Sequence, residues 1–340
     1  MLHDLPWILA IYLFVLLLFV LWPRTRRRGL LSSLFRLGIG LGASLVLLIV
    51  FFILFWIIPS SLREDIEQVL FLSWREHRLV IDFDQRHADI IIPNTKAPDQ
   101  GYPLLLVLHG YGNNKFETTW YMGLQPMADR YNLLLLIPNG SLEPWGRRFW
   151  NATEVCCDAR QAGVDDAGYL FSLLDKAKAE YPVDPNRVYI LGHSNGGYMA
   201  YRLACERPEL FQGIVSLAGA GSGREAQCSK AKALSVLQVH GERDGVVRYD
   251  GSDRDSPSAL KTAELWAQHM ECAEPPAMGK AEYDLAVFSK GNDTDSQTWK
   301  NCREGHSVAL WTVNGAGHMP LLTEDFFPKV WSFLSESKAH

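Results

Sequence analysis

Lysine- and arginine-rich stretches are missing from most of this 340-residue chain. Residues 1–62 contain five arginines and one aspartate, a local charge of +4, so the total of −5 leaves −9 on residues 63–340. That large part has no basic patch able to neutralise phosphates, and we expect no nucleic-acid partner. It also has no histidine pair at a metal-ligand spacing such as H-x-x-x-H beside an acid, so we expect neither a catalytic metal nor another cofactor.

Two segments near the N-terminus lack charged residues altogether, namely residues 5–22 and 37–58. At about 1.5 Å of rise per residue they would be roughly 27 and 33 Å long as helices, close to a hydrocarbon core of about 30 Å. Buried core helices are the alternative, but such helices normally carry a polar stripe, which these segments lack. The sequence therefore predicts a transmembrane hairpin that holds the chain in a lipid bilayer through residues 5–58.

The five arginines of the first 62 residues all lie between the two predicted spans. By the positive-inside rule this loop is cytoplasmic, which places both ends of the hairpin, and residues 63–340, on the extracytoplasmic side. A cleaved signal peptide would need positive charge before the first apolar run, whereas here the arginines follow it. A version with one span, in which the first segment is removed, stays open.

Residues 63–340 contain no internal repeat, low-complexity tract or linker, and with 48% apolar residues in the chain they can bury a sizeable core as one domain. Apolar runs typical of strands alternate with stretches of helical period, which predicts an α/β fold whose mainly parallel sheet has helices on both faces. The expected strands lie within residues 77–93, 103–110, 132–138, 187–193, 213–220, 234–241 and 307–318. The expected helices lie around residues 116–130, 165–181, 199–206, 259–269 and 324–334.

The pattern G-x-S-x-G occurs at Gly192 to Gly196, directly after one expected strand and directly before an expected helix. An ordinary turn could explain it, because the pattern is short and arises often by chance. In this context, however, the turn exposes a serine above the edge of the sheet, where it can act as a nucleophile. Ser194 is therefore the candidate nucleophile.

A serine hydroxyl needs a base to take its proton and an acid to orient that base, and both should follow later strands. Asp244 follows the strand at 234–241, and His318 ends the strand at 307–318 in a small-residue loop. Other acids have plainer roles: Asp165 and Asp166 are expected to cap a helix, and Asp250 and Asp253 to shape a loop.

Ester or amide cleavage also needs hydrogen-bond donors for the oxyanion of the transition state. The backbone N–H of Asn195, next to the nucleophile at a helix N-terminus, is one expected donor. The second is expected from Tyr111 in the glycine-rich segment 109–114, although a plain loop would also explain that segment.

With these residues the chain resembles the α/β-hydrolase superfamily, and more narrowly the group of polyhydroxybutyrate depolymerases and feruloyl or acetylxylan esterases. The resemblance covers roughly residues 103–320 and rests on "LHGYGNN", "WNATEVCCDARQAGVDDAGYL", "VDPNRVYILGHSNGGYMAYRLACERPELF", "VHGERDGVV" and "NGAGHMP". It implies an α/β-hydrolase fold, hydrolysis of small or polymeric carboxylic esters by an exported enzyme, and Ser194, Asp244 and His318 as nucleophile, acid and base. The two predicted spans depart from this group, where a secretory signal is expected.

All six cysteines lie in the large domain, and an even number on the extracytoplasmic side suits disulfides, although free buried thiols are the alternative. Six cysteines allow fifteen connectivities. The resemblance favours Cys272 paired with Cys302, and the adjacent Cys156 and Cys157 are expected to find separate partners. No cysteine lies in a turn like that of Ser194, so a cysteine hydrolase is not expected.

Four aromatic side chains are candidates to hold a sugar ring or an aromatic acyl group, because their segments should approach the carboxyl edge of the sheet: Trp120, Tyr121, Trp145 and Trp150. His109 is a further candidate for substrate binding. Core packing is the plainer explanation of tryptophans. Two other functions stay open on the sequence alone. One is a peptidase or thioesterase with the same three residues, and the other is a catalytically silent binding domain held at the membrane.

Overall fold

The computed structural model describes residues 76–80, 86–158, 160–252, 256–273, 275–287 and 291–336. The predicted spans at 5–22 and 37–58, and the domain boundary at residue 62, lie outside these ranges and stay predictions. None of the helices in the described ranges is both long and apolar enough to cross a bilayer.

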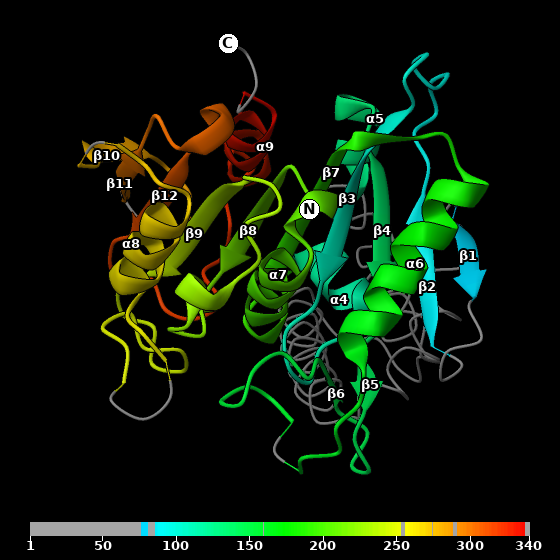
Figure 1. The fold of residues 1–340 in the computed structure, drawn as a ribbon, viewed down its shortest axis with the longest axis horizontal. Helices are drawn as coiled ribbons and strands as arrows, with labels where there is room; N and C mark the ends of the chain where they lie inside the picture. Colours follow the sequence, from blue (N-terminus) through cyan, green and yellow to red (C-terminus); the bar gives the residue numbers. More distant parts are fainter. Residues whose placement is uncertain are drawn as a thin grey trace, which may run out of the picture. The chain divides into compact units, whose positions relative to one another are not determined.

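A sheet of ten strands forms the centre of the described domain (Figure 1). Its six middle strands pair in parallel, and an antiparallel pair flanks them on each side. In spatial order the strands are β1 (Glu76–Val80), β2 (His87–Ile91), β4 (Leu134–Pro138), β3 (Tyr102–Leu108), β7 (Val183–His193), β8 (Gly213–Leu217), β9 (Ser235–Gly241), β12 (Val308–Val313), β11 (Thr294–Trp299) and β10 (Ala277–Tyr283). A separate two-stranded hairpin consists of β5 (Ser141–Leu142) and β6 (Arg148–Phe149).

The middle strands β3, β4, β8 and β9 are buried along their whole length. This is why their sequences are continuous apolar runs and not alternating patterns, since a parallel strand is covered on both faces. The prediction of a mainly parallel sheet is confirmed. All seven segments expected to contain strands do so, and the pair of strands expected from residues 77–93 consists of β1 and β2, which pair antiparallel.

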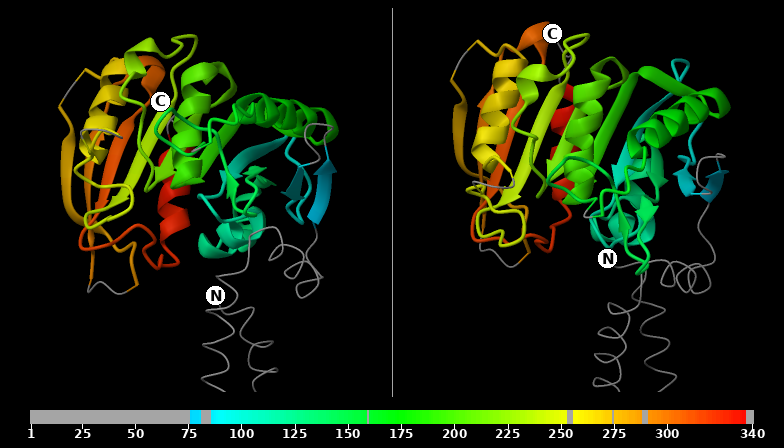
Figure 2. Two further views of the ribbon diagram at one scale, coloured as in Figure 1. Left: turned by 90° about the horizontal axis from the view of Figure 1, so that it is seen from below. Right: turned by 60° about the horizontal axis from the view of Figure 1, so that its bottom comes forward.

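Helices cover both faces of the sheet, as Figure 2 shows for α9 on one side and α7 and α8 on the other. The core on one face includes side chains of α6, α7 and α8, and the core on the other face includes side chains of α5 and α9. The α-helices are α4 (Lys115–Tyr121), α5 (Gln125–Tyr131), α6 (Asp166–Glu180), α7 (Asn195–Glu206), α8 (Ala259–His269) and α9 (Phe326–Glu336). Short 3₁₀ turns lie at Pro208–Leu210, Glu225–Gln227 and Arg303–Gly305.

The helix expected around residues 116–130 is two helices, α4 and α5. The break between them contains Gly123, whose φ of 61° lies in the left-handed region that glycine adopts without strain. Residues 115–121 and 125–131 are therefore helical, while the segment between them turns the chain.

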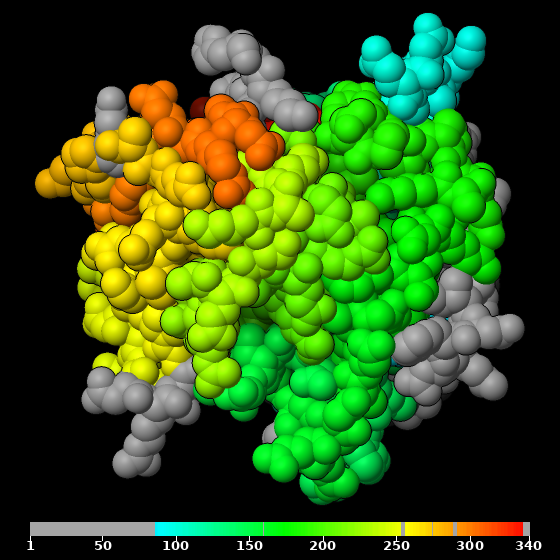
Figure 3. All heavy atoms as spheres, viewed as in Figure 1, coloured from blue at the N-terminus to red at the C-terminus, as the bar shows by residue number. Residues whose placement is uncertain are grey.

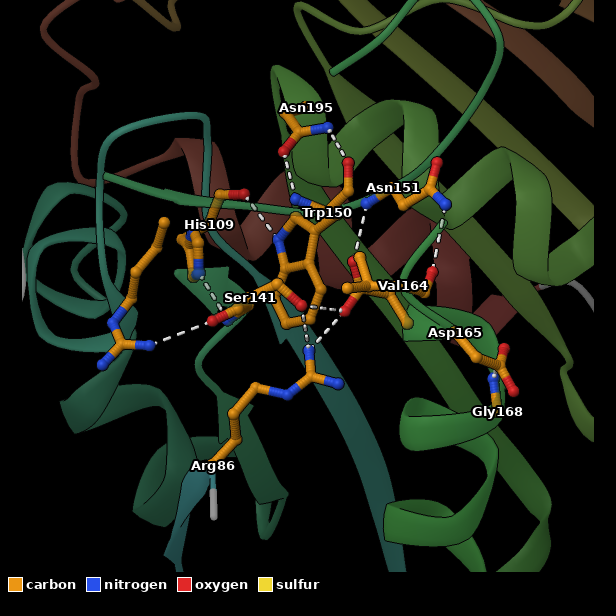
Figure 4. A network of polar contacts seen from close by, with 12 residues as sticks. Arg86, His109, Ser141, Trp150, Asn151, Val164, Asp165, Gly168 and Asn195 are labelled. Atoms are coloured by element: carbon orange, nitrogen blue, oxygen red, sulfur yellow. Dashed lines mark hydrogen bonds and ion pairs between the residues drawn. The ribbon is translucent and has the colours of Figure 1, made fainter. Parts of the chain in front are cut away.

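A buried ion pair joins the start of α6 to Arg86, which Figure 4 shows next to Ser141. Asp166 pairs with Arg86, accepts a hydrogen bond from the Ser141 hydroxyl at 2.8 Å, and accepts another from the Asn151 N–H at 2.7 Å. Both charged side chains are almost completely buried. Of the two aspartates expected to cap this helix, Asp165 does so by accepting from the Gly168 N–H, whereas Asp166 forms this network.

We predict that Asp166→Ala destabilises the domain by roughly 3–5 kcal/mol, because it leaves the Arg86 guanidinium buried without its carboxylate. Urea unfolding of the full-length protein in detergent measures the change. Glu154→Ala is the matched control, since it removes the exposed pair with Arg224 and should cost less than about 1 kcal/mol. Equal losses from the two substitutions would contradict the importance of the buried pair.

Candidate active site

Ser194 occupies a sharp turn between the end of β7 and the start of α7. Its φ of 53° and ψ of −118° are unusual for a residue with a side chain, and such conformations persist only where the surroundings enforce them. The glycines two positions away allow the turn. A Cβ on Gly192 would lie 2.1 Å from the Gly196 carbonyl oxygen, and one on Gly196 would lie 2.3 Å from the Leu108 carbonyl oxygen. G-x-S-x-G is thus required sterically in this structure.

His318 and Asp244 lie beside Ser194, although they are 124 and 50 residues away along the chain. The Ser194 Oγ is 2.9 Å from Nε2 of His318, and Nδ1 of His318 is 2.7 Å from Oδ2 of Asp244. The loops after β9 and β12 bring them together, because these two strands are parallel neighbours whose carboxyl ends meet at one edge. The structure therefore aligns hydroxyl, imidazole and carboxylate in the order that the sequence predicts.

Asp244 is held as an anion in spite of its burial. Burial on its own raises the pKa of this carboxyl group, but hydrogen bonds from His240 and His318, the charge of His318, and the Val246 N–H together hold the pKa well below its ordinary value. The backbone N–H groups of Val246 and Val247 donate to Oδ1 at 2.8 and 2.9 Å. Oδ2 is thereby left facing the imidazole of His318.

Two backbone N–H groups near Ser194 lack an acceptor within the described part of the chain: those of Tyr111 and Asn195. Asn195 begins α7, so its N–H points out of the helix N-terminus, where partial positive charge favours an anion. The loop of Tyr111 also lies close to Ser194, since a Cβ on Gly110, the residue before Tyr111, would lie 3.3 Å from the Cβ of Ser194. Both predicted donors therefore belong to segments next to Ser194.

The phospholipase/carboxylesterase family model matches residues 85–271, which is more than half of the chain. The chain belongs to this family. This confirms the predicted resemblance, the α/β-hydrolase fold and the assignment to the carboxylic ester hydrolases.

Individual relatives of this carboxylesterase-family chain share 30% or less of its sequence in the three examples that follow. The provisionally named esterase NocK of Nocardia uniformis subsp. tsuyamanensis is 30% identical over 237 residues, which cover 66% of this chain and 67% of NocK. Feruloyl esterase B of Piromyces equi is 25% identical over 251 residues, 68% of this chain but only 42% of the relative. An acetyl xylan esterase from Aspergillus awamori shares the fold, with a TM-score of 0.59, 14% identity, and coverage of 76% of this chain and 98% of that structure.

His109 and Trp150 are not open to a ligand in this carboxylesterase-family structure, which corrects their prediction as substrate contacts. Both are buried, and their polar atoms serve the loops around the site. His109 donates from Nδ1 to the Gly110 carbonyl and accepts from the Gly140 N–H at Nε2, while the Trp150 indole donates to the His109 carbonyl (Figure 4). They fix the backbone on which Tyr111 lies.

The side chain of Asn195 adds a second restraint on this region. Its amide accepts from the Trp150 N–H at 2.7 Å and donates to the Trp150 carbonyl at 2.8 Å (Figure 4). It also lies 3.4 Å from the Cys156 sulfur. The first residue of α7 therefore fastens the loop at 150–157 beside the nucleophile.

The substrate-binding candidates Trp120 and Tyr121 differ in their exposure and contacts. The Trp120 side chain is 54% exposed and could contact a ligand. The Tyr121 hydroxyl donates to the Pro320 carbonyl at 2.9 Å, and its ring lies 5.4 Å from that of His193. Burial raises the pKa of Tyr121, which remains a neutral phenol that holds the segment after His318.

All six cysteines form disulfides in the structure. Cys272 pairs with Cys302, as the resemblance implies. The prediction of separate partners for Cys156 and Cys157 is wrong, because these two residues are bonded to each other. The remaining cysteines, Cys205 and Cys228, lie 4.5 Å apart between their Cα atoms and pair with one another. No other cysteine is therefore left as a partner for Cys156 or Cys157.

Sequence reasoning missed the contact between Asp244 and a second histidine, His240, which precedes it by four residues. Its Nε2 lies 3.2 Å from Oδ2 of Asp244. His193 lies next to the site as well, with Nε2 donating to the His318 carbonyl at 3.3 Å. Burial first, and the neighbouring His318 second, lower the pKa of His193 to about 4. In the described ranges no group of three His, Cys, Asp or Glu side chains is arranged to hold a metal ion.

The pKa of His109 yields a prediction about stability. Burial lowers this pKa to about 3, the carbonyl of Gly110 partly opposes the effect, and the charge of Arg148 adds to it. The unfolded chain, with an ordinary pKa of about 6.5, binds the proton first as the pH falls, so stability is lost from that pH downward.

We predict that, between pH 7 and pH 5, the free energy of unfolding falls by about 2 kcal/mol less in His109→Gln than in the wild-type protein. Urea unfolding at the two pH values measures this difference. The exposed His87 on β2 provides the control, because His87→Gln should leave the difference between the two pH values unchanged. An unaltered difference in His109→Gln would count against a buried neutral imidazole.

Proposed function

We propose that the domain hydrolyses carboxylic esters with Ser194 as nucleophile, His318 as base and Asp244 as the acid that orients the base. The observation that carries this proposal is the unbroken line of hydrogen bonds from Ser194 Oγ through His318 to Asp244, at 2.9 and 2.7 Å. A serine is activated in this way when a base lies within hydrogen-bond reach and is itself oriented by a third group. The positions of His318 and Asp244 meet these two conditions.

The chemistry follows from the positions of the protons. Ser194 Oγ attacks the ester carbonyl as its proton passes to Nε2 of His318, and the carbonyl oxygen becomes an oxyanion that the N–H groups of Asn195 and Tyr111 stabilise. The imidazolium then gives its proton to the departing alcohol, which leaves an acyl group on Ser194. A water molecule, deprotonated by His318, cleaves the acyl-enzyme and restores the serine. Asp244 keeps its negative charge throughout and stabilises the imidazolium.

Exposed apolar side chains lie on the loops that carry the site residues and on segments next to those loops, and they favour an ester with an apolar or aromatic acyl group. We call them the apolar rim: Tyr111, Trp120, Leu142, Trp145, Val246, Met319 and Leu321. Several adjoin a site residue directly. Tyr111 follows Gly110, the Val246 N–H donates to Asp244, and Met319 follows His318. Exposed apolar side chains that gather in one place mark binding surfaces more often than scattered ones do.

The β5–β6 hairpin carries part of the rim. It is tied to the loop of Tyr111, whose hydroxyl donates to Glu143 at 2.8 Å, while the Gly112 N–H donates to the Arg148 carbonyl at 2.8 Å. Trp145 at its tip is 65% exposed, and its ring lies 3.8 Å from the guanidinium of Arg160. In the space-filling view the green atoms of this part of the chain project at the lower edge of the visible face (Figure 3). Relatives named as feruloyl and acetylxylan esterases support an ester substrate with an aromatic or a short acyl group.

The proposal for the location of the domain is that residues 5–22 and 37–58 anchor it on the extracytoplasmic side of a membrane. Three disulfides in the described ranges support it, because disulfides persist in oxidising compartments. The same three site residues could serve a thioesterase or peptidase. A panel of acyl esters, thioesters and short peptides of matched acyl group separates these activities, and we expect esters to be preferred.

The first prediction for this function concerns the nucleophile and the acid. Ser194→Ala should lower hydrolysis of p-nitrophenyl acetate by a factor on the order of a million, without loss of folding. Asp244→Asn should lower kcat by a factor on the order of ten thousand, because the imidazole loses its orienting anion. The exposed Asp250 in the same loop is the matched control, and Asp250→Asn should retain full activity. Substantial turnover by Ser194→Ala would refute the assignment.

The second prediction concerns the apolar rim. Trp145→Ser or Trp120→Ser should lower kcat/KM for feruloyl and long-chain acyl esters about fivefold each and leave acetate esters within twofold, because each change removes apolar contact area. Met278 is 69% exposed on the outermost strand, β10, so Met278→Ser serves as the control. Equal effects on acetyl and feruloyl esters would rule out a role of the rim in acyl recognition.

A further inference from the structure

Asp244 shares one of its oxygens between two imidazoles. Oδ2 lies 2.7 Å from Nδ1 of His318 and 3.2 Å from Nε2 of His240. His240 lies near the end of β9 and is completely buried, and its Nε2 also lies 2.8 Å from the Val247 carbonyl oxygen. Burying a histidine costs free energy unless both ring nitrogens have hydrogen-bond partners. The partner of Nδ1 therefore decides which nitrogen of His240 carries the proton.

The partner of that other nitrogen fixes where the proton of His240 lies. Nδ1 is 2.8 Å from Nε2 of Gln238, and this amide nitrogen can only donate a hydrogen bond. The amide cannot be turned around, because the same nitrogen donates to the Gly219 carbonyl at 2.7 Å. Nδ1 of His240 must therefore accept, and the ring proton must be on Nε2, directed between the Val247 carbonyl and Asp244.

The orientation of Gln238 is fixed in turn by the nucleophile helix. The Tyr201 hydroxyl, on α7, donates to the Gln238 carbonyl oxygen at 2.7 Å. Tyr201, Gln238 and His240 are all buried, and the Tyr201 ring stacks on Trp266 at 5.6 Å. A continuous buried chain of donors thus runs from α7 to the carboxylate. Simple core packing would need none of these polar atoms.

We propose that His240 is a positioning residue of the hydrolytic site. As a neutral Nε2–H donor fixed by Gln238, it holds Oδ2 of Asp244 in place and reduces the negative charge on the oxygen that faces His318. This inference rests on the proposed function of Ser194, His318 and Asp244. Without the His240 N–H the carboxylate attracts the proton of His318 more strongly. The protonated, inactive base then persists to higher pH, and the carboxylate is free to rotate.

The titratable groups around His240 and His318 could also affect the pH profile of kcat/KM, so their positions matter. The ring of His193 lies 5.2 Å from that of His318, and Tyr249 lies 5.8 Å from His240. Burial lowers the pKa of His193 to about 4 and raises the pKa values of Tyr249 and Tyr201. Neighbouring charged side chains of the same loop, Glu242 and Arg243, are exposed to solvent.

The test compares His240→Phe with His240→Gln in the full-length protein in detergent. Phenylalanine keeps the ring and removes the donor, so we expect kcat to fall on the order of tenfold with KM within twofold. The acid limb of the pH profile of kcat/KM should move up by about half a unit to one unit. Glutamine can accept from Gln238 and donate to Asp244, and it should restore most of the rate and the original acid limb.

The matched control is His306→Phe. His306 is also fully buried, next to Ser235 at the opposite end of β9, so its loss tests the general effect of removing a buried histidine. It should lower the free energy of unfolding without moving the acid limb. An acid limb unchanged in His240→Phe, or moved equally in His306→Phe, overturns the proposal.

A spectroscopic arm is independent of turnover and of the folding of any variant. With ¹⁵N-labelled histidine in the wild-type protein at pH 7.5, the ring proton of His240 should be found on Nε2. If esters are not hydrolysed but this tautomer is found, the proposed function fails while the hydrogen-bond assignment stands. A proton on Nδ1 of His240 overturns the proposal, whether or not the protein is active.

Discussion

The close approach of the turn at Ser194 to strand β3 is the constraint on which the rest of the site depends. Gly196 must lie against the Leu108 carbonyl, and Gly192 against Gly196, for the serine to stand clear of the sheet with a positive φ. The same approach brings the loop after β3, with Tyr111, and the N-terminus of α7 close to Ser194. The proposed nucleophile and its proposed oxyanion donors are therefore positioned by one backbone packing arrangement and not by separate devices.

Charge at the site is organised around one buried anion. Asp244 has backbone donors on one oxygen and two imidazoles on the other, and these contacts outweigh the cost of burying it. His109 and His193, which lie next to the site, are neutral structural groups, because burial lowers their pKa values. In the proposed mechanism, the site contains one charged pair, Asp244 with His318, and this pair forms only when His318 takes the proton of Ser194.

Much of this arrangement could be predicted because it depends on local patterns. Buried parallel strands are apolar runs, and each of Ser194, Asp244 and His318 follows such a run, so parallel pairing alone brings them to one edge. Strands β10 and β11 were missed, since their exposed or half-buried sequences contain few apolar residues. The pairing of Cys156 with Cys157, the burial of His109 and Trp150, and the contact of His240 with Asp244 depend on how loops pack, which sequence periodicity does not encode.

The most direct test of the account is the chemical fate of Ser194 during turnover. The full-length protein in detergent is mixed with p-nitrophenyl butyrate and quenched in acid within milliseconds, and the peptide that contains Ser194 is then examined by mass spectrometry. We predict a butyryl group on Ser194, in an amount equal to the initial burst of p-nitrophenolate. Hydrolysis with no acyl group on Ser194, or with the acyl group on another side chain, would contradict the account.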